Sequence, residues 1–228
     1  MIRGRMKIIN KPLSFVRTIT FIIALSLINT IYPLRANIKN RAGGRSNLSL
    51  LPLPQVCQST SHSCGASSLQ SVLNYWGISK REDELMKLCN TSTDGTFPYD
   101  IVEVAQKLGL NAELRQNLTV KDLEMSVSKG IPVIVLVQAY KDDKGLSWAD
   151  DWDDGHYMVI IGVDQRNVYL EDPELLGSRG FIPRDEFEGR WHSRERSHDG
   201  KLKEKFIRTG IFIRGKKPKY PRPFVRIC

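Results

Sequence analysis

The spacing of hydrophobic residues changes about halfway along this 228-residue chain, and that change constrains the fold more than any other feature. Between residues 69 and 130, apolar residues recur at intervals of three and four, the period of an amphipathic helix. Beyond residue 130, short apolar and β-branched runs are separated by polar turns, as expected of buried strands. Helices followed by strands indicate an α+β fold, in which an N-terminal helical part packs on a mostly antiparallel sheet.

The same pattern predicts the positions of the elements. Helices are expected around residues 69–76, 85–89, 101–108, 119–130 and 183–191. Strands are expected at residues 132–137, 156–163, 167–170 and 206–213. In the fourth helix Val120, Leu123 and Val127 share one face, so they are expected to point into the core.

The formal net charge of +9 would by itself suggest a nucleic-acid or anionic-lipid partner. The positive charge lies at the two ends, because residues 1–36 contribute +6 and residues 201–228 contribute +9. Residues 37–200 are left with a net charge of −6. A nucleic-acid-binding face should extend across the folded surface, so no nucleic acid is expected among the partners.

Residues 1–36 have the composition of an export signal. A basic region precedes an apolar run of about 14 residues, which is short for a membrane span of about 20 but suits the core of a signal peptide. The residues at 34–36 make a poor cleavage site, because Leu34 is not small. The protein is therefore expected to be exported (periplasmic, cell-envelope or extracellular), with membrane association through this segment if the signal stays uncleaved.

Three further boundaries follow from composition. Residues 37–56 are polar and then proline-rich, which predicts a linker. Residues 57–213 hold all the periodic segments and form the expected domain. Residues 214–228 are basic and proline-rich, which predicts an exposed tail.

The four cysteines, at positions 57, 64, 89 and 228, are too few to form a disulfide-dense scaffold. In an exported protein they allow two disulfides, with the pairing left open. Cys64 is expected to stay unpaired, because its surroundings suit a nucleophile.

Cys64 stands where the first helix is expected to begin, in the segment Gln58-Ser59-Thr60-Ser61-His62-Ser63-Cys64-Gly65-Ala66. A thiol attacks only as the thiolate, and the positive end of a helix dipole favours that anion. The backbone N–H of Cys64 and the side chain of Gln58 are candidate donors to an oxyanion, and Gly65 would let a substrate carbonyl approach the backbone. Taken alone, such a cysteine is more often a buried structural thiol.

A candidate base and its partner follow on two consecutive strands. His156 stands at the entrance to the second predicted strand, where rigid backbone would hold it, and Asp172 follows the end of the third. If those strands form a hairpin, the start of one lies beside the end of the other, so Asp172 would contact and orient the imidazole of His156. Cysteine, histidine and aspartate in this chain order match the requirements of papain-like catalysis.

Together these motifs resemble the C39-like peptidases, a family related to the domains that trim double-glycine leaders in bacteriocin exporters. The resemblance covers residues 57–213 and rests on Gln58 ahead of Cys64-Gly65-Ala66, on Asp154-Gly155-His156-Tyr157, and on Glu171-Asp172-Pro173. It implies a papain-like fold and hydrolysis of a peptide or protein substrate through a thioacyl-enzyme on Cys64. It also implies His156 as base, Asp172 as its orienting partner, Gln58 as oxyanion donor, and no metal or other cofactor.

Three other functions remain open at this point. The acyl group could pass to an amine instead of water, which would make the chain an acyltransferase or transpeptidase. The fold could also bind peptides without catalysis. A zinc site built from Cys57, His62, Cys64 and Cys89 is a weaker alternative, because the spacing departs from that of paired structural ligands.

Other polar residues compete with the chosen site. His62 is a second candidate base, but nothing nearby is placed to orient it. Asp164 competes with Asp172, and His192 and His198 are expected in a solvated segment. Six aspartates crowd residues 142–154, which predicts a solvated loop, a calcium site, or an acidic rim with Trp148 and Trp152 that would favour cationic peptides.

Overall fold

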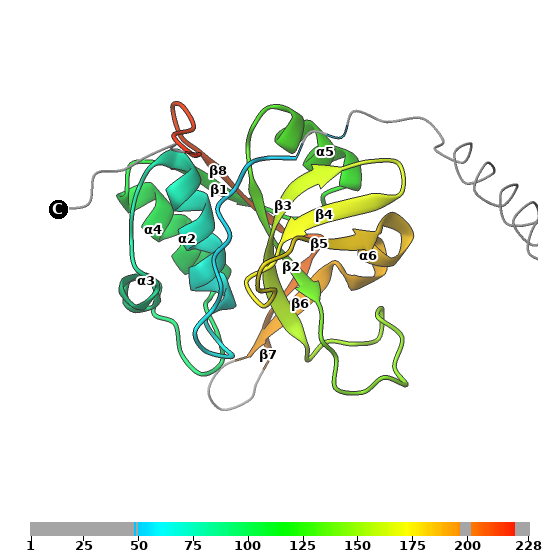
Figure 1. Ribbon diagram of the computed structural model, residues 1–228. Coiled ribbons are helices and arrows are strands. Elements are labelled where there is room, and N and C mark those ends of the chain that lie inside the picture. The colour runs from blue at the N-terminus through cyan, green and yellow to red at the C-terminus, as the bar shows by residue number, and fades with distance from the viewer. Residues whose placement is uncertain (1–47, 49, 197–201, 222–228) are drawn as a thin grey trace, which may run out of the picture. The chain divides into compact units, whose positions relative to one another are not determined.

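A computed structural model describes residue 48, residues 50–196 and residues 202–221 (Figure 1). The predicted export signal, His198 and Cys228 lie outside these residues. Among the described residues, no helix combines the length and the apolarity needed to cross a membrane.

The five predicted helices are all present. They are α2 (Cys64–Trp76), α3 (Glu82–Leu88), α4 (Pro98–Lys107), α5 (Val120–Ser128) and α6 (Arg184–Arg190). The inward face predicted for α5 is confirmed, since Val120, Leu123 and Val127 are buried. Thr119 caps this helix by accepting a hydrogen bond from the backbone N–H of Asp122, which satisfies one of the donors left free at a helix start.

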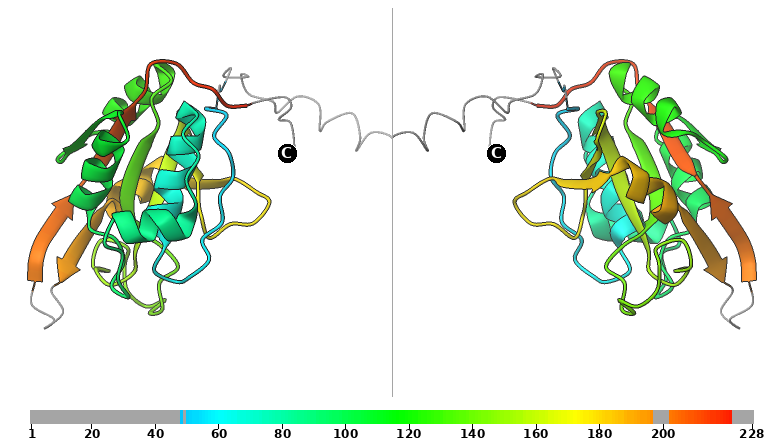
Figure 2. Two further views of the ribbon diagram at one scale, coloured as in Figure 1. Left: turned by 90° about the vertical axis from the view of Figure 1, so that its left-hand side faces the viewer. Right: turned by 90° about the vertical axis from the view of Figure 1, so that its right-hand side faces the viewer.

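The strands form a sheet with one additional ribbon. The sheet has the order β1-β8-β2-β3-β4-β5 and every neighbouring pair is antiparallel, whereas β6 and β7 pair only with each other. The strands are β1 (Asn111–Arg115), β2 (Val133–Gln138), β3 (Gly155–Val163), β4 (Asn167–Glu171), β5 (Gly180–Pro183), β6 (His192–Arg196), β7 (Leu202–Ile207) and β8 (Gly210–Arg214). Figure 2 shows the β6–β7 ribbon (orange) extending beyond the sheet. The predicted α+β class with an antiparallel sheet is confirmed.

One predicted strand is wrong in its extent. Residues 206–213 form parts of two strands, β7 and β8, which belong to different sheets. Arg208, between them, has φ of 44°, a left-handed conformation that no strand can continue through.

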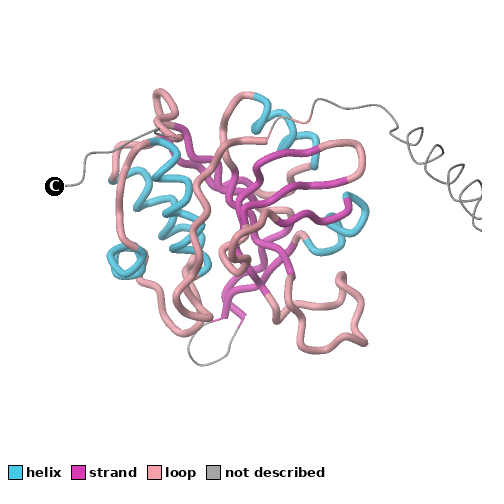
Figure 3. Tube along the Cα trace, in the orientation of Figure 1, coloured by secondary structure: helices cyan, strands magenta, loops and turns pink. Residues whose placement is uncertain are grey.

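The sheet has a hydrophobic core on each face. Along β2, Ile134 and Leu136 join the core beneath α2 and α4, whereas Val133, Val135 and Val137 join the core beneath α5 and α6. Successive side chains of a strand point to opposite faces, so a continuous apolar run marks a strand covered on both sides. Figure 3 shows helices on both sides of the strands, and a long loop that joins β2 to β3.

The folded part begins before residue 57, within the segment predicted as a linker. The backbone N–H of Leu51 donates to the carbonyl of Ile161 at 2.7 Å, and the side chain of Leu53 is buried in the core. These two leucines pack on the sheet because this removes their apolar surface from water. The prolines around them led to the prediction of a linker. At the other end, the N–H of Lys219 donates to the carbonyl of Tyr75, so part of the predicted tail lies against α2.

Candidate active site

Cys64 is the first residue of α2, as its sequence context predicts, and its side chain is buried. Residues 58–63, the approach loop, lead into this helix. The hydroxyl of Ser63 stabilises the loop, because it donates to the carbonyl of Thr60 and accepts from the N–H of Thr60. The first helical hydrogen bond runs from Ser67 N–H to Ser63 carbonyl. The thiol therefore stands at the positive end of a helix of 13 residues.

Glu82 fixes the approach loop from α3. One of its carboxylate oxygens accepts hydrogen bonds from the N–H of Ser59 and from the hydroxyl of Ser67, at 2.9 and 2.8 Å. Burial alone would raise the pKa of Glu82, but hydrogen bonds from Ser59, Ser63 and Ser67 together outweigh burial and lower it. The charged carboxylate of Glu82 therefore joins Ser59, in the loop before Cys64, to Ser67 in α2.

Gly65 is needed for packing, and its role in letting a substrate carbonyl approach the backbone stays a prediction. A Cβ atom at this position would lie 2.9 Å from the Cβ of Thr96 and 3.2 Å from the ring of Tyr157. Gly65 itself is buried. Only a residue without a side chain lets α2 approach β3 this closely.

His156 and Asp172 are brought together by the hairpin of β3 and β4. His156 is the second residue of β3, Asp172 directly follows β4, and the antiparallel register pairs Val159 with Glu171. Nε2 of His156 lies 2.8 Å from Oδ1 of Asp172, and both side chains are buried. The predicted proximity of the two residues is thereby confirmed.

The imidazole of His156 also contacts the thiol of Cys64. Burial lowers the pKa of His156, but hydrogen bonds to Asp172 and Cys64 outweigh burial and raise it to about 9. Because Nε2 faces Asp172, Nδ1 is the nitrogen left for Cys64. The imidazole thus lies between a carboxylate and a thiol, an arrangement suited to moving a proton from sulfur.

Asp172 accepts two hydrogen bonds besides the one from His156. The hydroxyl of Tyr140 donates to Oδ2 at 2.7 Å, and the N–H of Glu174 donates to Oδ1 at 2.9 Å. Burial raises the pKa of Asp172, and the hydrogen bonds from His156, Tyr140 and Glu174 together hold it below its usual value. Sequence analysis did not identify Tyr140. The sequence does place Tyr140 just after the buried run 132–137, at the end of a strand next to the start of the following one, and that position could have marked it as a site residue.

The raised pKa of His156 predicts how its contribution to stability depends on pH. The folded protein holds this proton up to about pH 9, whereas the unfolded chain releases it near pH 6.5. The stabilisation is therefore complete below pH 6.5 and is lost as the pH rises through about 9. Over this interval we expect wild type to lose of the order of 1–3 kcal/mol relative to a His156→Gln variant. Urea unfolding at a series of pH values measures this difference. With His62→Gln as the control, parallel curves for wild type and His156→Gln would contradict the expectation.

Gln58 is tied to the aspartate side of the site. Its backbone N–H donates to the carbonyl of Pro173 at 2.9 Å, so the loop before Cys64 is joined to the loop after Asp172. Its side-chain Oε1 is buried and has no hydrogen-bond partner within the described residues. The role of Gln58 as an oxyanion donor stays a prediction.

The acidic loop between β2 and β3 is partly folded into the domain. Asp151 is buried, its carbonyl is bonded to Nε2 of His192 at 2.6 Å, and Asp153 pairs with Arg194. The expectation that His192 lies in a solvated segment is wrong, since it is buried and its ring packs against Trp152 with centroids 4.3 Å apart. These aromatic and ionic contacts hold the loop against the β6–β7 ribbon.

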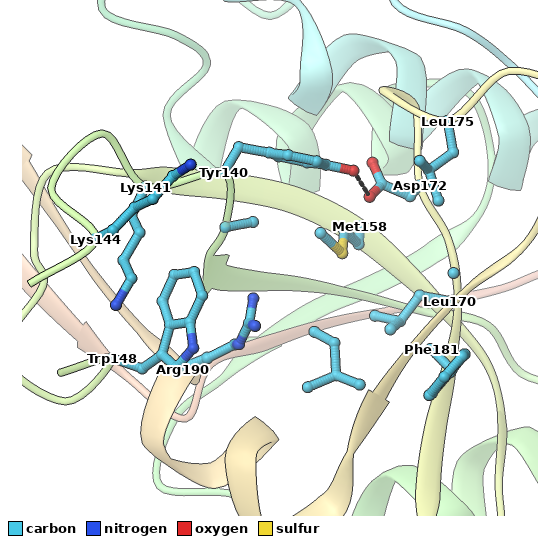
Figure 4. A pocket seen from close by; sticks show the side chains of 13 residues that line it. Tyr140, Lys141, Lys144, Trp148, Met158, Leu170, Asp172, Leu175, Phe181 and Arg190 are labelled. Atoms are coloured by element: carbon cyan, nitrogen blue, oxygen red, sulfur yellow. Dashed lines mark hydrogen bonds between the residues drawn. The ribbon is translucent and has the colours of Figure 1, made fainter. Parts of the chain in front are cut away.

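A pocket of about 580 Å³ lies beside Asp172, on the face of the sheet that carries α6 (Figure 4). Tyr140 and Asp172 form one side of it, and Met158, Leu170 and Ile182 contribute apolar surface. Trp148 lines the opposite side, with Arg190 at 3.5 Å and Lys141 at 4.2 Å from its ring centroid. Besides these two cations the lining includes Lys144, and Asp172 is its one acidic residue among those described. Trp148 therefore has basic neighbours in this pocket, and an acidic rim formed by the aspartates of residues 142–154 stays a prediction.

The zinc and disulfide alternatives gain no support. No group of three or more histidine, cysteine or acidic side chains is arranged to hold a metal ion in the described part of the chain. Cys57, Cys64 and Cys89 are all unpaired, and the last two are buried. Burial raises the pKa of Cys89 to about 12, so this thiol stays protonated at neutral pH.

Comparison with known proteins gives a family match. Residues 50–198 match the model of the peptidase C39-like family. Among curated proteins, an uncharacterized protein of Methanothermobacter thermautotrophicus is 35% identical over 120 residues, covering 53% of this chain and 71% of that protein. The pediocin PA-1 transport/processing ATP-binding protein PedD of Pediococcus acidilactici is 26% identical over 136 residues. The match covers 60% of this chain but only 17% of PedD.

Two solved structures share the fold. The peptidase domain of Streptococcus ComA, a bifunctional ABC transporter, has a TM-score of 0.52 at 23% identity, covering 70% of this chain and 96% of that domain. A structure from Bacillus anthracis described as a C39-like peptidase has a TM-score of 0.56 at 21% identity, covering 75% of this chain and 99% of that one. At these identities the likeness supports the papain-like fold.

Proposed function

Because this chain belongs to the peptidase C39-like family, we propose that it is a cysteine peptidase that hydrolyses peptide bonds with Cys64 as nucleophile. The observation that carries the proposal is the imidazole of His156, which is hydrogen-bonded to Asp172 and interacts with the thiol of Cys64, so that the pKa of His156 is raised. Three residues from α2, β3 and the end of β4 thus meet in the order nucleophile, base and orienting carboxylate.

The reaction begins with the proton of the Cys64 thiol already on His156, so that the attacking sulfur is a thiolate paired with the imidazolium. The sulfur then forms a bond to the scissile carbonyl carbon, and the carbonyl π electrons move to its oxygen. The backbone N–H of Cys64 and the side-chain amide of Gln58 donate to this oxyanion. When the carbon–nitrogen bond breaks, protonated His156 gives its proton to the leaving amine, and a thioacyl-enzyme remains.

In the second half, His156 removes a proton from water as the water oxygen attacks the thioester carbonyl. The carbon–sulfur bond breaks, the carboxylic acid product leaves, and the sulfur of Cys64 is again a thiolate paired with protonated His156. Throughout both halves Asp172 holds the imidazole and stabilises its protonated form, without itself taking the proton.

The substrate is proposed to be a peptide or an unfolded segment of a protein. PedD and ComA are named for transport and processing, but this chain covers only 17% of PedD, so their activities as whole proteins are not carried over. The papain-like fold and a nucleophile at a helix start both suit an extended chain that passes across the site.

Incubation with a peptide library in H₂¹⁸O tests this function directly. We expect new peptides whose C-termini carry one ¹⁸O from the attacking water, detected by mass spectrometry, and their absence with the Cys64→Ala variant. Products joined to an added amine, with no ¹⁸O, would instead support acyl transfer. No change in any peptide at all, from a protein shown to be folded, would contradict catalysis on peptides.

We also propose, from the sequence alone, that residues 1–36 direct export. The basic region and the short apolar run support this proposal. N-terminal sequencing of the protein from its native host would find a start near Asn37 if the signal is cleaved. An intact Met1 in membranes would indicate an uncleaved anchor, and an intact Met1 in the cytoplasmic fraction would contradict export.

A further inference from the structure

Tyr140 contacts both members of the Asp172–His156 pair. Its hydroxyl donates to Oδ2 of Asp172 at 2.7 Å. Its ring meets the imidazole edge to face, with centroids 5.5 Å apart and an interplanar angle of 86°. Figure 4 shows the tyrosine pointing at the carboxylate across one side of the pocket. The side chain of Tyr140 thus contacts both His156 and Asp172 and also lines the pocket.

The backbone of Tyr140 is held in a conformation that aromatic residues rarely adopt. Its φ is 57°, in the left-handed region, whereas two of the three other non-glycine residues with positive φ among those described are asparagines, which tolerate it. The residues before it are fixed, because Ala139 N–H donates to the carbonyl of Asp154 at 2.9 Å and the buried Gln138 bonds to His192. Such conformations persist only where the surroundings impose them, and they concentrate at functional sites.

The carboxylate of Asp172 has a specific need for this hydroxyl. Oδ1 accepts from His156 and from the N–H of Glu174, whereas Tyr140 is the one donor to Oδ2 found among the described residues. Asp172 is only 3% exposed, so water does not readily replace a lost donor. Without the hydroxyl, only the N–H of Glu174 would help His156 to fix which oxygen of the carboxylate faces the imidazole.

The hydroxyl remains a donor at neutral pH. Burial, the hydrogen bond to Asp172 and the negative charges of Asp172 and Glu174 raise the pKa of Tyr140, and the opposing effect of Arg190 is smaller. The phenol is therefore protonated throughout the range in which a cysteine–histidine pair operates.

We propose that Tyr140 is a positioning residue for catalysis, whose hydroxyl holds the Asp172 carboxylate so that Oδ1 faces His156. This inference rests on the proposed peptidase function and adds a fourth side chain to the three that carry it. Tyr140 is also half exposed and lines the pocket.

Tyr140→Phe removes the hydroxyl and keeps the ring. We expect kcat to fall about tenfold, the rate equivalent of roughly 1.4 kcal/mol, with KM changed by less than about twofold. In an Asp172→Asn background the same change should cost less than about twofold, because the carboxylate it orients is gone. Tyr99→Phe is the matched control, since Tyr99 also donates to a carboxylate, that of Glu204 at 3.2 Å, away from the site. Additive losses in the double variant would overturn the proposal.

The titration of His156 gives a readout that does not depend on peptide turnover. In NMR spectra of the folded wild type we expect a midpoint near 9. In Tyr140→Phe it should fall, because a loosened carboxylate stabilises the imidazolium less, and in Tyr99→Phe it should not move. An unchanged or higher midpoint in Tyr140→Phe would overturn the positioning role. If wild type cleaves no peptide but these shifts appear, the proposed function fails, whereas the orientation of Asp172 by Tyr140 stands.

Discussion

Cys64→Ala is expected to lower kcat/KM for any peptide substrate by at least about 10⁴-fold. The methyl group of alanine cannot attack a carbonyl carbon, so the thioacyl-enzyme does not form. Little stability should be lost, because the thiol is a small part of the core beneath α2. The measurement is the initial rate on a peptide found by library screening, with a thermal melt of each variant.

Cys57→Ala is the control for loss of a thiol elsewhere. Cys57 is exposed, and its sulfur lies 3.8 Å from the carbonyl of Leu175. We expect its rate to match that of wild type within about twofold. Turnover retained in Cys64→Ala, or lost equally in both variants, would contradict the assignment of the nucleophile.

His156→Ala is expected to have the second largest effect, a fall in kcat/KM of about 10³–10⁶-fold. The thiol then has no base to take its proton, and the leaving amine has no proton source. Removing the imidazole also leaves the buried carboxylate of Asp172 without its cationic partner, so some loss of stability should accompany the loss of rate.

His62→Ala separates the two candidate bases. His62 lies in the approach loop two residues before Cys64 and is only partly buried, and we expect its removal to change the rate by less than about threefold. The melts identify any variant that is merely unfolded. A folded His62→Ala variant without activity, beside an active His156→Ala variant, would transfer the role of base to His62.

Hydrophobic periodicity was sufficient to predict the elements that form the centre of the domain. The run 132–137 is apolar on both faces because β2 is covered on both sides, and the stripe of α5 was visible because only one side of that helix is covered. The elements that sequence analysis missed are the short or edge strands. β1 (Asn111–Arg115) and β5 (Gly180–Pro183) lie at the two edges of the sheet, where partial exposure leaves no clear apolar run.

The same contrast holds for the candidate site. Some of its residues could be predicted from local sequence patterns, and others depend on contacts between distant parts of the chain. Cys64, His156 and Asp172 were found because each stands at the end of a predictable element, and the hairpin argument needed only neighbouring strands. Tyr140 and Glu82 act through contacts to residues 32 and 23 positions away in the chain, with no recurring local pattern. His192 was misassigned for the same reason, since its burial depends on its contacts with the loop before β3.

The most direct test of the account is the rate at which each thiol of the folded protein is alkylated. Brief treatment with iodoacetamide, followed by digestion and mass spectrometry, gives a rate for Cys57, Cys64, Cys89 and Cys228 in one experiment. If His156 keeps the sulfur of Cys64 in its reactive thiolate form, Cys64 reacts far faster than exposed Cys57, and His156→Ala removes that difference in rate. If Cys64 reacts no faster than Cys57, or is found in a disulfide, the proposal of a Cys64–His156–Asp172 triad is contradicted.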